Sequence, residues 1–241
     1  MNGEVDNQPL TKKQRRALRR EERRLEVAKG HRKGVIGKIV VVASVVVVIG
    51  GIGWLIVKGG GGATTPLAPD NDPFKGSVTA KVVINEFSDL QCPACKAAEP
   101  VIKQVIDTYG DKIKFIYNNF PIPSHQNGRN SAIAGECAFD QGKFWEFHDL
   151  LFDKQDTWGN ISNPKDTFVA DAISLGMDGT KFAACYDGSD AKKRVDYDES
   201  EGNAAGVNST PTFIINGQKI VGAQPFEEFK KVIDAKLSAV Q

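Results

Sequence analysis

Two cysteines, Cys92 and Cys95, stand two residues apart in the sequence Cys-Pro-Ala-Cys, a spacing that suits thiol–disulfide exchange. This sequence follows a predicted strand and opens a predicted helix, so Cys92 lies where free backbone N–H groups and the helix dipole stabilise a thiolate. Pro93 suits the first helical turn, because its missing N–H would have no partner there. Cys95 lies one turn further on, close enough to form a disulfide. We predict Cys92 as the attacking thiol and Cys95 as the more buried resolving thiol.

Half of a zinc site is the main alternative for two cysteines at this spacing. A complete site needs a second close pair of cysteine or histidine ligands. Cys137 and Cys185 stand far apart, and His125 and His148 form no closely spaced histidine pair. We therefore expect no metal ion and no cofactor, and chemistry by the two thiols alone.

A second feature is the sequence Thr210-Pro211-Thr212, immediately before a predicted strand. A proline is tolerated at the first residue of a strand, so Pro211 could simply mark where the strand begins. A cis Thr210–Pro211 bond would instead expose backbone groups that pair with an extended substrate peptide beside the active cysteines. Both interpretations stay open from the residues alone.

The elements that must position these residues follow from the hydrophobic pattern. Short runs rich in β-branched residues predict strands at Lys81–Phe87, Lys112–Phe120, Thr212–Ile215 and Lys219–Val221. A helix runs from Cys92 to Tyr109, helical patterns fill residues 124–205, and Phe226–Leu237 is an amphipathic helix. The turn Asn216-Gly217 is a strong hairpin signal. The predicted order is βαβ, a helical block, then ββα.

Three segments, Glu86–Cys95, Gly142–Phe152 and Gly206–Ile233, resemble the DsbA-like disulfide oxidoreductases of the thioredoxin superfamily. The resemblance extends from about Ser77 towards the C-terminus. It implies an α/β thioredoxin-like fold with an inserted helical domain at about residues 124–205, which agrees with the predicted order of elements.

The resemblance also implies roles for individual residues. Cys92 would be the nucleophile, Cys95 the resolving thiol and Pro211 the cis-proline. Glu86, six residues before Cys92, would accept a proton from the resolving thiol, whereas a carboxylate facing water at a strand end is the alternative. Substrate contacts would come from Pro93, Ala94 and Thr210.

This family resemblance implies a protein disulfide oxidoreductase, and we expect it to introduce disulfides into exported proteins that carry cysteine thiols. A membrane redox partner or a small oxidant would reoxidise it. A reductase or isomerase would use the same cysteines in reverse, because direction depends on reduction potential and partner. A non-enzymatic peptide-binding module is the alternative from another class. Ala94 stands where the most oxidising members carry histidine, which predicts lower oxidising power.

Five further residues have weaker signals. Cys137 and Cys185 lie within the helical block, and we predict a structural disulfide between them, with two buried thiols as the alternative. Trp145 and the phenylalanines around it have helical spacing, so we interpret them as core rather than as a peptide-binding patch, and His148 beside them as structural. His125 lies in a loop without a visible partner.

The N-terminal part of the chain has the pattern of a membrane anchor. Residues 1–33 carry 11 Lys/Arg against 5 Asp/Glu, and Ile39–Val57 is a run of 19 uncharged residues. A bilayer core needs about 20 helical residues. We predict a cytoplasmic head at 1–34, an uncleaved transmembrane signal anchor at 35–58 and a flexible linker at 59–76. A buried core helix would show an amphipathic stripe, and a cleaved signal would have a shorter apolar run.

The part of the chain beyond the anchor is acidic. Residues 59–241 carry 18 Lys/Arg against 25 Asp/Glu, a net charge of −7, which argues against a nucleic-acid partner. We expect residues 77–241 to form the redox domain on the outer side of the cell membrane, because the basic head stays in the cytoplasm. A single anchor with this orientation suits a bacterial plasma membrane.

Protease added to intact protoplasts should therefore remove the domain after Gly62 and leave residues 1–34 protected, because the apolar run separates them. Immunoblotting of tags at the two ends measures this. A cytoplasmic marker must survive as the control, and a protected redox domain would contradict the topology.

Overall fold

The computed structural model describes residues 72–239, which all belong to one compact unit of the fold. The predicted basic head and the predicted transmembrane anchor, residues 1–58, lie outside the described residues. Along residues 72–239, every helix falls short of the length and apolar character that crossing a membrane requires.

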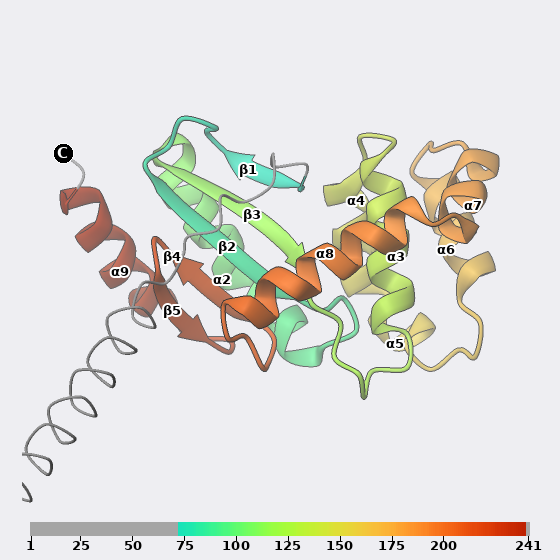
Figure 1. Cartoon of the computed structure of the whole chain (residues 1–241). Coiled ribbons are helices and arrows are strands. Elements are labelled where there is room, and N and C mark those ends of the chain that lie inside the picture. The colour runs from blue at the N-terminus through green and yellow to red at the C-terminus, as the bar shows by residue number, and fades with distance from the viewer. Residues whose placement is uncertain (1–71, 240–241) are drawn as a thin grey trace, which may run out of the picture. The chain divides into compact units, whose positions relative to one another are not determined.

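A five-stranded mixed sheet lies at the centre of this unit, with the strand order β1-β3-β2-β4-β5 (Figure 1). Its strands are β1 (Phe74–Gly76), β2 (Val82–Ser88), β3 (Ile113–Asn119), β4 (Thr212–Ile215) and β5 (Gln218–Val221). β2 and β3 run parallel, while the other neighbouring pairs are antiparallel. A parallel pair needs a crossover, which α2 (Pro93–Tyr109) and the short 3₁₀ helix η1 (Gly110–Lys112) supply.

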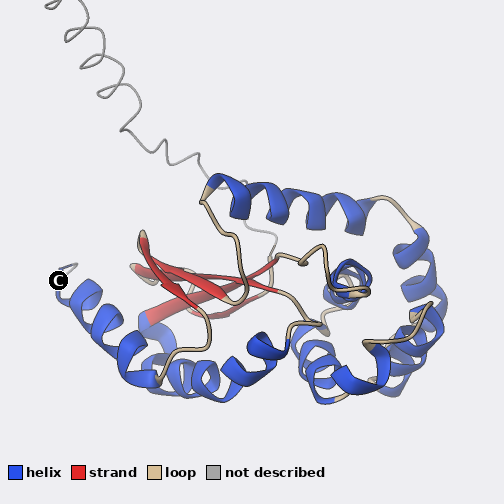
Figure 2. Ribbon diagram, turned by 90° about the horizontal axis from the view of Figure 1, so that it is seen from below, coloured by secondary structure: helices blue, strands red, loops and turns tan. Residues whose placement is uncertain are grey.

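A block of helices is inserted between β3 and β4. It consists of α3 (Gly128–Phe139), α4 (Phe144–Asp153), α5 (Gln155–Trp158), α6 (Lys165–Ser174), α7 (Gly179–Asp187) and α8 (Asp190–Ala204). Figure 1 shows α3 to α7 to one side of the sheet and α8 returning towards it. After β5, α9 (Phe226–Ala239) joins α2 on the face opposite α8 (Figure 2). The predicted α/β fold with an inserted helical block is confirmed.

Alternation along the strands divides the core between the two faces of the sheet. Ile84 of β2 is buried against α2 and α9, whereas Phe87 packs with Phe120 on the face that α8 covers. Gly202 of α8 permits this approach, because a Cβ there would lie 2.5 Å from the ring of Phe120. Successive side chains of a strand face opposite ways, so Glu86 lies on the same face as Ile84 and points towards α2.

The predicted boundary between linker and folded domain, at Ser77, is wrong. Phe74–Gly76, inside the predicted linker, forms the edge strand β1, which pairs with β3. The N–H of Tyr117 also donates to the carbonyl of Pro73 (2.9 Å). Three residues are too few to show a strand periodicity, and pairing with β3, far away in sequence, defines this strand.

Two local features show how turn and cap residues set the elements. The hairpin signal at Asn216-Gly217 is confirmed, since the two residues have positive φ of 42° and 83°. The sequence patterns do not predict α7 as a separate helix. It begins after Asp178, whose carboxylate accepts from the N–H groups of Thr180 and Lys181 (2.9 and 3.0 Å). The cap marks the start of α7 more clearly than any apolar stripe.

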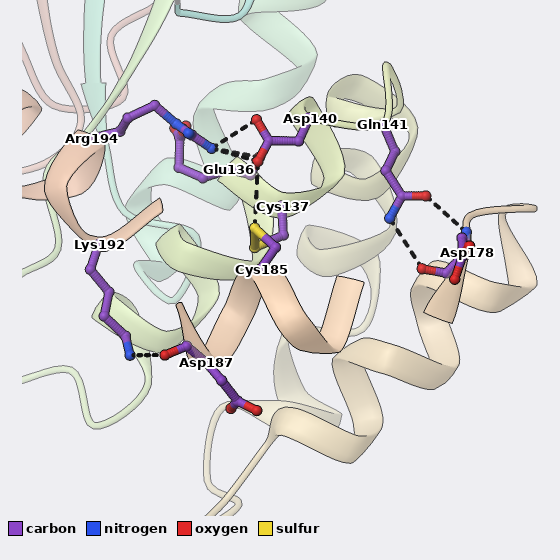
Figure 3. Close-up of a disulfide and its surroundings, with 9 residues drawn as sticks. All are labelled: Glu136, Cys137, Asp140, Gln141, Asp178, Cys185, Asp187, Lys192 and Arg194. Carbon is purple, nitrogen blue, oxygen red and sulfur yellow. Dashed lines mark hydrogen bonds and ion pairs between the residues drawn. A yellow bond between two sulfur atoms is a disulfide. The ribbon is translucent and has the colours of Figure 1, made fainter. Parts of the chain in front are cut away.

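Cys137 of α3 and Cys185 of α7 form a disulfide, so the predicted pairing is present in the structure (Figure 3). The bond joins residues 48 positions apart within the helical insertion. Beside it, Arg194 of α8 pairs with Glu136 of α3 and with Asp140, the residue that follows α3. The insertion is therefore held together by a covalent link and by ion pairs.

Replacing both Cys137 and Cys185 with alanine should lower the free energy of unfolding by ~4 kcal/mol, because the unfolded chain regains the entropy of an open loop. For a domain of this size, that loss corresponds to a melting temperature roughly 10 °C lower. Thiol-exchange rates at Cys92 should hold, since the bond lies in the insertion. An unchanged melting temperature, measured by circular dichroism, would contradict the structural role.

Candidate active site

Cys92 is the N-cap residue of α2, with extended backbone angles of φ −74° and ψ 121°. Its N–H donates to the carbonyl of Asp89 (2.8 Å), and its carbonyl accepts from the N–H of Lys96 (3.2 Å). Pro93 takes the first helical turn, as predicted. Cys92 is 7% exposed and Cys95 is 0% exposed, and both are free thiols. Of the two, only Cys92 reaches the surface.

The surroundings of Cys92 lower the pKa of its thiol to about 5. The hydrogen bond from the Cys95 side chain contributes most, and burial opposes it. The Thr210 side chain and the backbone N–H groups of Cys95 and Ala94 lower the pKa further. Ala94 thus supports the thiolate through its backbone, although its side chain offers no hydrogen bond. Cys92 is therefore ionised at neutral pH, in the form that attacks a disulfide.

Cys95 has the opposite environment. Burial raises the pKa of its thiol well above the ordinary value, and the hydrogen bond to Cys92, the Cys92 charge and the Glu86 charge raise it further. Cys95 therefore keeps its proton while Cys92 is ionised. The two cysteines have the properties predicted for an attacking and a resolving thiol.

The Thr210–Pro211 peptide bond is cis, in the loop that leads into β4. The carbonyl oxygen of Thr210 lies 3.5 Å from Sγ of Cys92, which donates to it when protonated. The carbonyl of Pro211 is already occupied, because it accepts from the N–H of Gly222 (2.8 Å). The fold thus brings together Cys92 and Thr210, which lie 118 positions apart in the sequence. Pro93 and Ala94 are exposed beside them, and their contacts with a substrate stay a prediction.

Glu86 is buried, so the alternative of a carboxylate facing water is wrong. It pairs in register with Tyr117 of β3, on the face of the sheet that α2 covers. Its pKa is raised well above the ordinary value, first by burial and then by the Glu99 charge, against smaller effects of Ser88 and Lys75. The charge of the Glu86 carboxylate in turn raises the pKa of Cys95, so the two buried groups are coupled electrostatically.

His125, which has no visible partner in the sequence, is bound to a buried aspartate. Its Nδ1 lies 2.6 Å from Oδ2 of Asp89, which also accepts from the N–H of Ile122 (2.8 Å). Oδ1 of Asp89 accepts from the N–H of Gln91 (2.8 Å). Asp89 thus fastens the loop after β3 to the segment that leads into Cys92. Partners 36 positions apart in two loops leave no periodic signal in a sequence.

The helical insertion also holds the active segment. Nε2 of Gln155, in α5, donates to the carbonyls of Leu90 (2.8 Å) and Cys92 (3.1 Å). Gln91 donates to the carbonyl of Gly159 (2.8 Å). These buried amide contacts, which the sequence patterns do not reveal, set the position of the Cys92 backbone from the side of the insertion.

His148 packs in the core, as predicted, with its ring centroid 5.2 Å from that of Tyr117. It also faces two acidic side chains. Within the described range, Glu99, His148 and Asp149 each bring one carboxylate oxygen or imidazole nitrogen to within 4.8 Å of the others. The active thiols do not belong to this group.

The chain matches the family model described as Thioredoxin over residues 69–235. A Na(+)/H(+) antiporter NhaA 3 of Salinispora tropica is 29% identical over 170 residues, which cover 70% of this chain and 25% of that protein. The chain thus spans about a quarter of the length of the curated relatives it matches.

Two solved structures share the fold of the described unit. Alpha-DsbA1 of Wolbachia pipientis has a TM-score of 0.64 at 23% identity, covering 72% of this chain and 94% of that chain. Oxidised BdbD of Bacillus subtilis has a TM-score of 0.63 at 24% identity, covering 71% of this chain and 95% of that chain. At this level of identity the likeness shows the DsbA-like fold.

Alkylation of the reduced protein with iodoacetamide should show a Cys92 rate that is half-maximal at about pH 5. The rate should be constant at neutral pH and fall tenfold per pH unit below pH 5, because only the thiolate reacts. Cys95 should stay slow throughout. Mass spectrometry of the modified peptides measures both rates.

A Cys95→Ala variant provides the control, since the Cys95 side chain is the largest cause of the low Cys92 pKa. Its Cys92 should titrate at higher pH than in the natural protein. A Cys92 that titrates like a free cysteine in the natural protein would refute the assigned environment.

Proposed function

This chain belongs to the thioredoxin family, and from that premise we propose that it catalyses thiol–disulfide exchange with cysteine-containing proteins. The observation that carries the proposal is the pairing of an ionised Cys92 at a helix N-terminus with a buried, protonated Cys95. The cis Thr210–Pro211 bond beside them supplies an adjacent backbone edge for an extended peptide. A module that only binds peptides would not require this difference between the two thiols.

The exchange requires only the Cys92–Cys95 disulfide of this protein and two thiols of the substrate. A substrate thiolate attacks Sγ of Cys92 in the Cys92–Cys95 disulfide, which breaks as a mixed disulfide forms, and Cys95 takes up a proton. A second substrate thiolate then attacks the substrate sulfur of the mixed disulfide, and Cys92 leaves as a thiolate. The substrate loses two electrons and gains a disulfide, while the protein disulfide is reduced.

The proposed direction is oxidation of the substrate. An ionised Cys92 is a good leaving group, and its stabilisation favours the reduced protein, which makes the protein disulfide an oxidant. Ala94 lacks the side-chain interaction that a histidine would add, so we place the protein below the strongest oxidants. A reductase or isomerase would need a reducing partner that holds Cys92 and Cys95 in the dithiol form.

The proposed location is the outer side of the cell membrane, with exported proteins as substrates and a membrane partner as oxidant. Support comes from the apolar run Ile39–Val57 and the basic residues before it. Disulfides persist in such compartments, which suits the Cys137–Cys185 bond. Ion antiport, named for the longer relatives, is not proposed here, because this chain spans about a quarter of their length.

A Cys95→Ala variant should accumulate mixed disulfides with substrate proteins, because the resolving thiol is absent, whereas Cys92→Ala should trap none. Non-reducing electrophoresis after acid quenching measures the trapped species, and the double variant is the control. Absence of trapped partners in Cys95→Ala would contradict the enzymatic proposal.

The direction is tested by equilibrating the natural protein, which has both cysteines, with glutathione buffers and measuring the fraction that carries the Cys92–Cys95 disulfide. A potential more positive than about −180 mV, the value of protein disulfide isomerase, supports an oxidase. A potential near that of thioredoxin, about −270 mV, would favour the reductase.

A further inference from the structure

Proton movement at Cys95 sets a problem that the two thiols do not solve. Under the proposed function, Cys95 gains a proton when the disulfide opens and loses it when the disulfide re-forms. Cys95 is 0% exposed, so this proton has to pass through other protein groups. Glu86 is the first such group, because its charge acts on Cys95 and it is buried as well.

Polar atoms without a hydrogen-bond partner gather around Glu86. Folded proteins leave few buried polar atoms unpaired, so a cluster of them calls for an explanation. In the described part of the chain, this cluster comprises Glu86 Oε1, Ser88 Oγ, Tyr117 OH, Glu99 Oε1 and His148 Nε2. Three of them project from the sheet face under α2, and the other two come from α2 and α4.

The last two atoms extend the cluster away from the active cysteines. Glu99 stands one helical turn after Cys95 on α2, and its charge acts on Glu86. Oε1 of Glu99 lies 3.7 Å from Nε2 of His148 on α4. The rings of Tyr117 and His148 pack edge to face, with their centroids 5.2 Å apart and an interplanar angle of 87°. Glu86 is therefore coupled electrostatically to Glu99, and Glu99 lies directly beside His148.

His148 connects this cluster with solvent. A groove of about 540 Å³ between α2 and α4 is lined by both Glu99 and His148. Nδ1 of His148 lies 2.8 Å from Oδ1 of Asp149, whose side chain is 65% exposed. One ring nitrogen thus faces the carboxyl group of Glu99, and the other faces the exposed carboxylate of Asp149.

We propose that Glu99 and His148 carry protons between the Glu86 carboxyl group beneath Cys95 and solvent in the groove between α2 and α4. When the disulfide opens, Glu86 gives its proton to the Cys95 sulfur, and Glu86 is reprotonated from Glu99. His148 passes a proton from its Nε2 to Glu99 and takes one from solvent at Nδ1. Re-formation of the disulfide reverses each transfer, so atoms and charges balance.

Charged side chains of both signs line the groove beside the relay. Lys75 of β1 lies over the groove, as do Lys96 and Lys103 of α2, while Asp149 and Asp153 face it from α4. The pKa of Glu99 is raised, first by burial, and this brings the carboxyl group closer to the pH at which a relay works in both directions. The three lysines oppose a divalent cation at the same side chains, so we favour proton transfer over metal binding.

The test is a His148→Gln variant of the full chain, with Phe144→Leu as the matched control. Phe144 packs against the same ring, at 5.7 Å, and carries no proton. Oxidised protein is mixed rapidly with a dithiol peptide, and the opening of the Cys92–Cys95 disulfide is followed from pH 5 to 9 in H₂O and D₂O. His148→Gln should slow this step ~10-fold or more near neutral pH and enlarge the solvent isotope effect.

The apparent pKa of Cys92 from alkylation should not move in His148→Gln, and Phe144→Leu should keep the natural pH profile and isotope effect. Glu99→Gln, at a partly exposed side chain that tolerates substitution, should reproduce the effect, and the double variant should add little. Natural rates and profiles in both single variants would overturn the relay. Absence of disulfide exchange in the natural protein would instead refute the function on which the relay rests.

Discussion

The hydrogen bond between the Cys95 thiol and the Cys92 thiolate is the interaction on which the rest of the site depends. It is the largest cause of the low Cys92 pKa, and it requires Cys95 to remain protonated at the same time. Burial of Cys95 secures that proton, while the N-terminus of α2 leaves Cys92 at the surface. Two thiols one helical turn apart thus differ in burial, and this difference leaves one as a thiolate and the other as a protonated thiol.

Three parts of the fold position Cys92 and produce this difference between the two thiols. The segment before Cys92 leaves the carboxyl end of the central strand β2. The helix α2 begins just after it, because Pro93 suits the first helical turn. The cis bond before Pro211 places the Thr210 carbonyl 3.5 Å from the sulfur. The insertion adds Gln155, which holds the Cys92 carbonyl. The inserted helices are therefore part of the support for the active segment as well as a covering for the sheet.

Sequence patterns predict the parts of this arrangement that are local. Cys-Pro-Ala-Cys, the strand before it and the Asn216-Gly217 turn carry their signals within a few residues, and the structure has each of them. Sequence patterns do not predict β1, because three residues show no periodicity and its partner strand β3 lies far away in the sequence. The contact between Asp89 and His125 escapes for the same reason, since it joins two loops. The family resemblance, rather than periodicity, pointed to Glu86, and only the structure shows that it is buried and lies beside Tyr117 of β3.

Burial keeps the Cys95 thiol protonated, but it also separates this thiol from solvent. Polar groups in the core are therefore needed if a proton is to reach or leave Cys95. An apolar lining around Cys95 would keep its pKa high but would leave no path for the proton that each exchange moves. A lining of fully hydrogen-bonded groups would be stable but would resist changes of protonation. Glu86, Tyr117 and Glu99 are buried or partly buried and incompletely paired, which is costly for stability and suited to groups that change charge. His148 lines the groove between α2 and α4, and Thr210 is not among the residues that line it, so these groups meet solvent at a place separate from the loop beside Cys92.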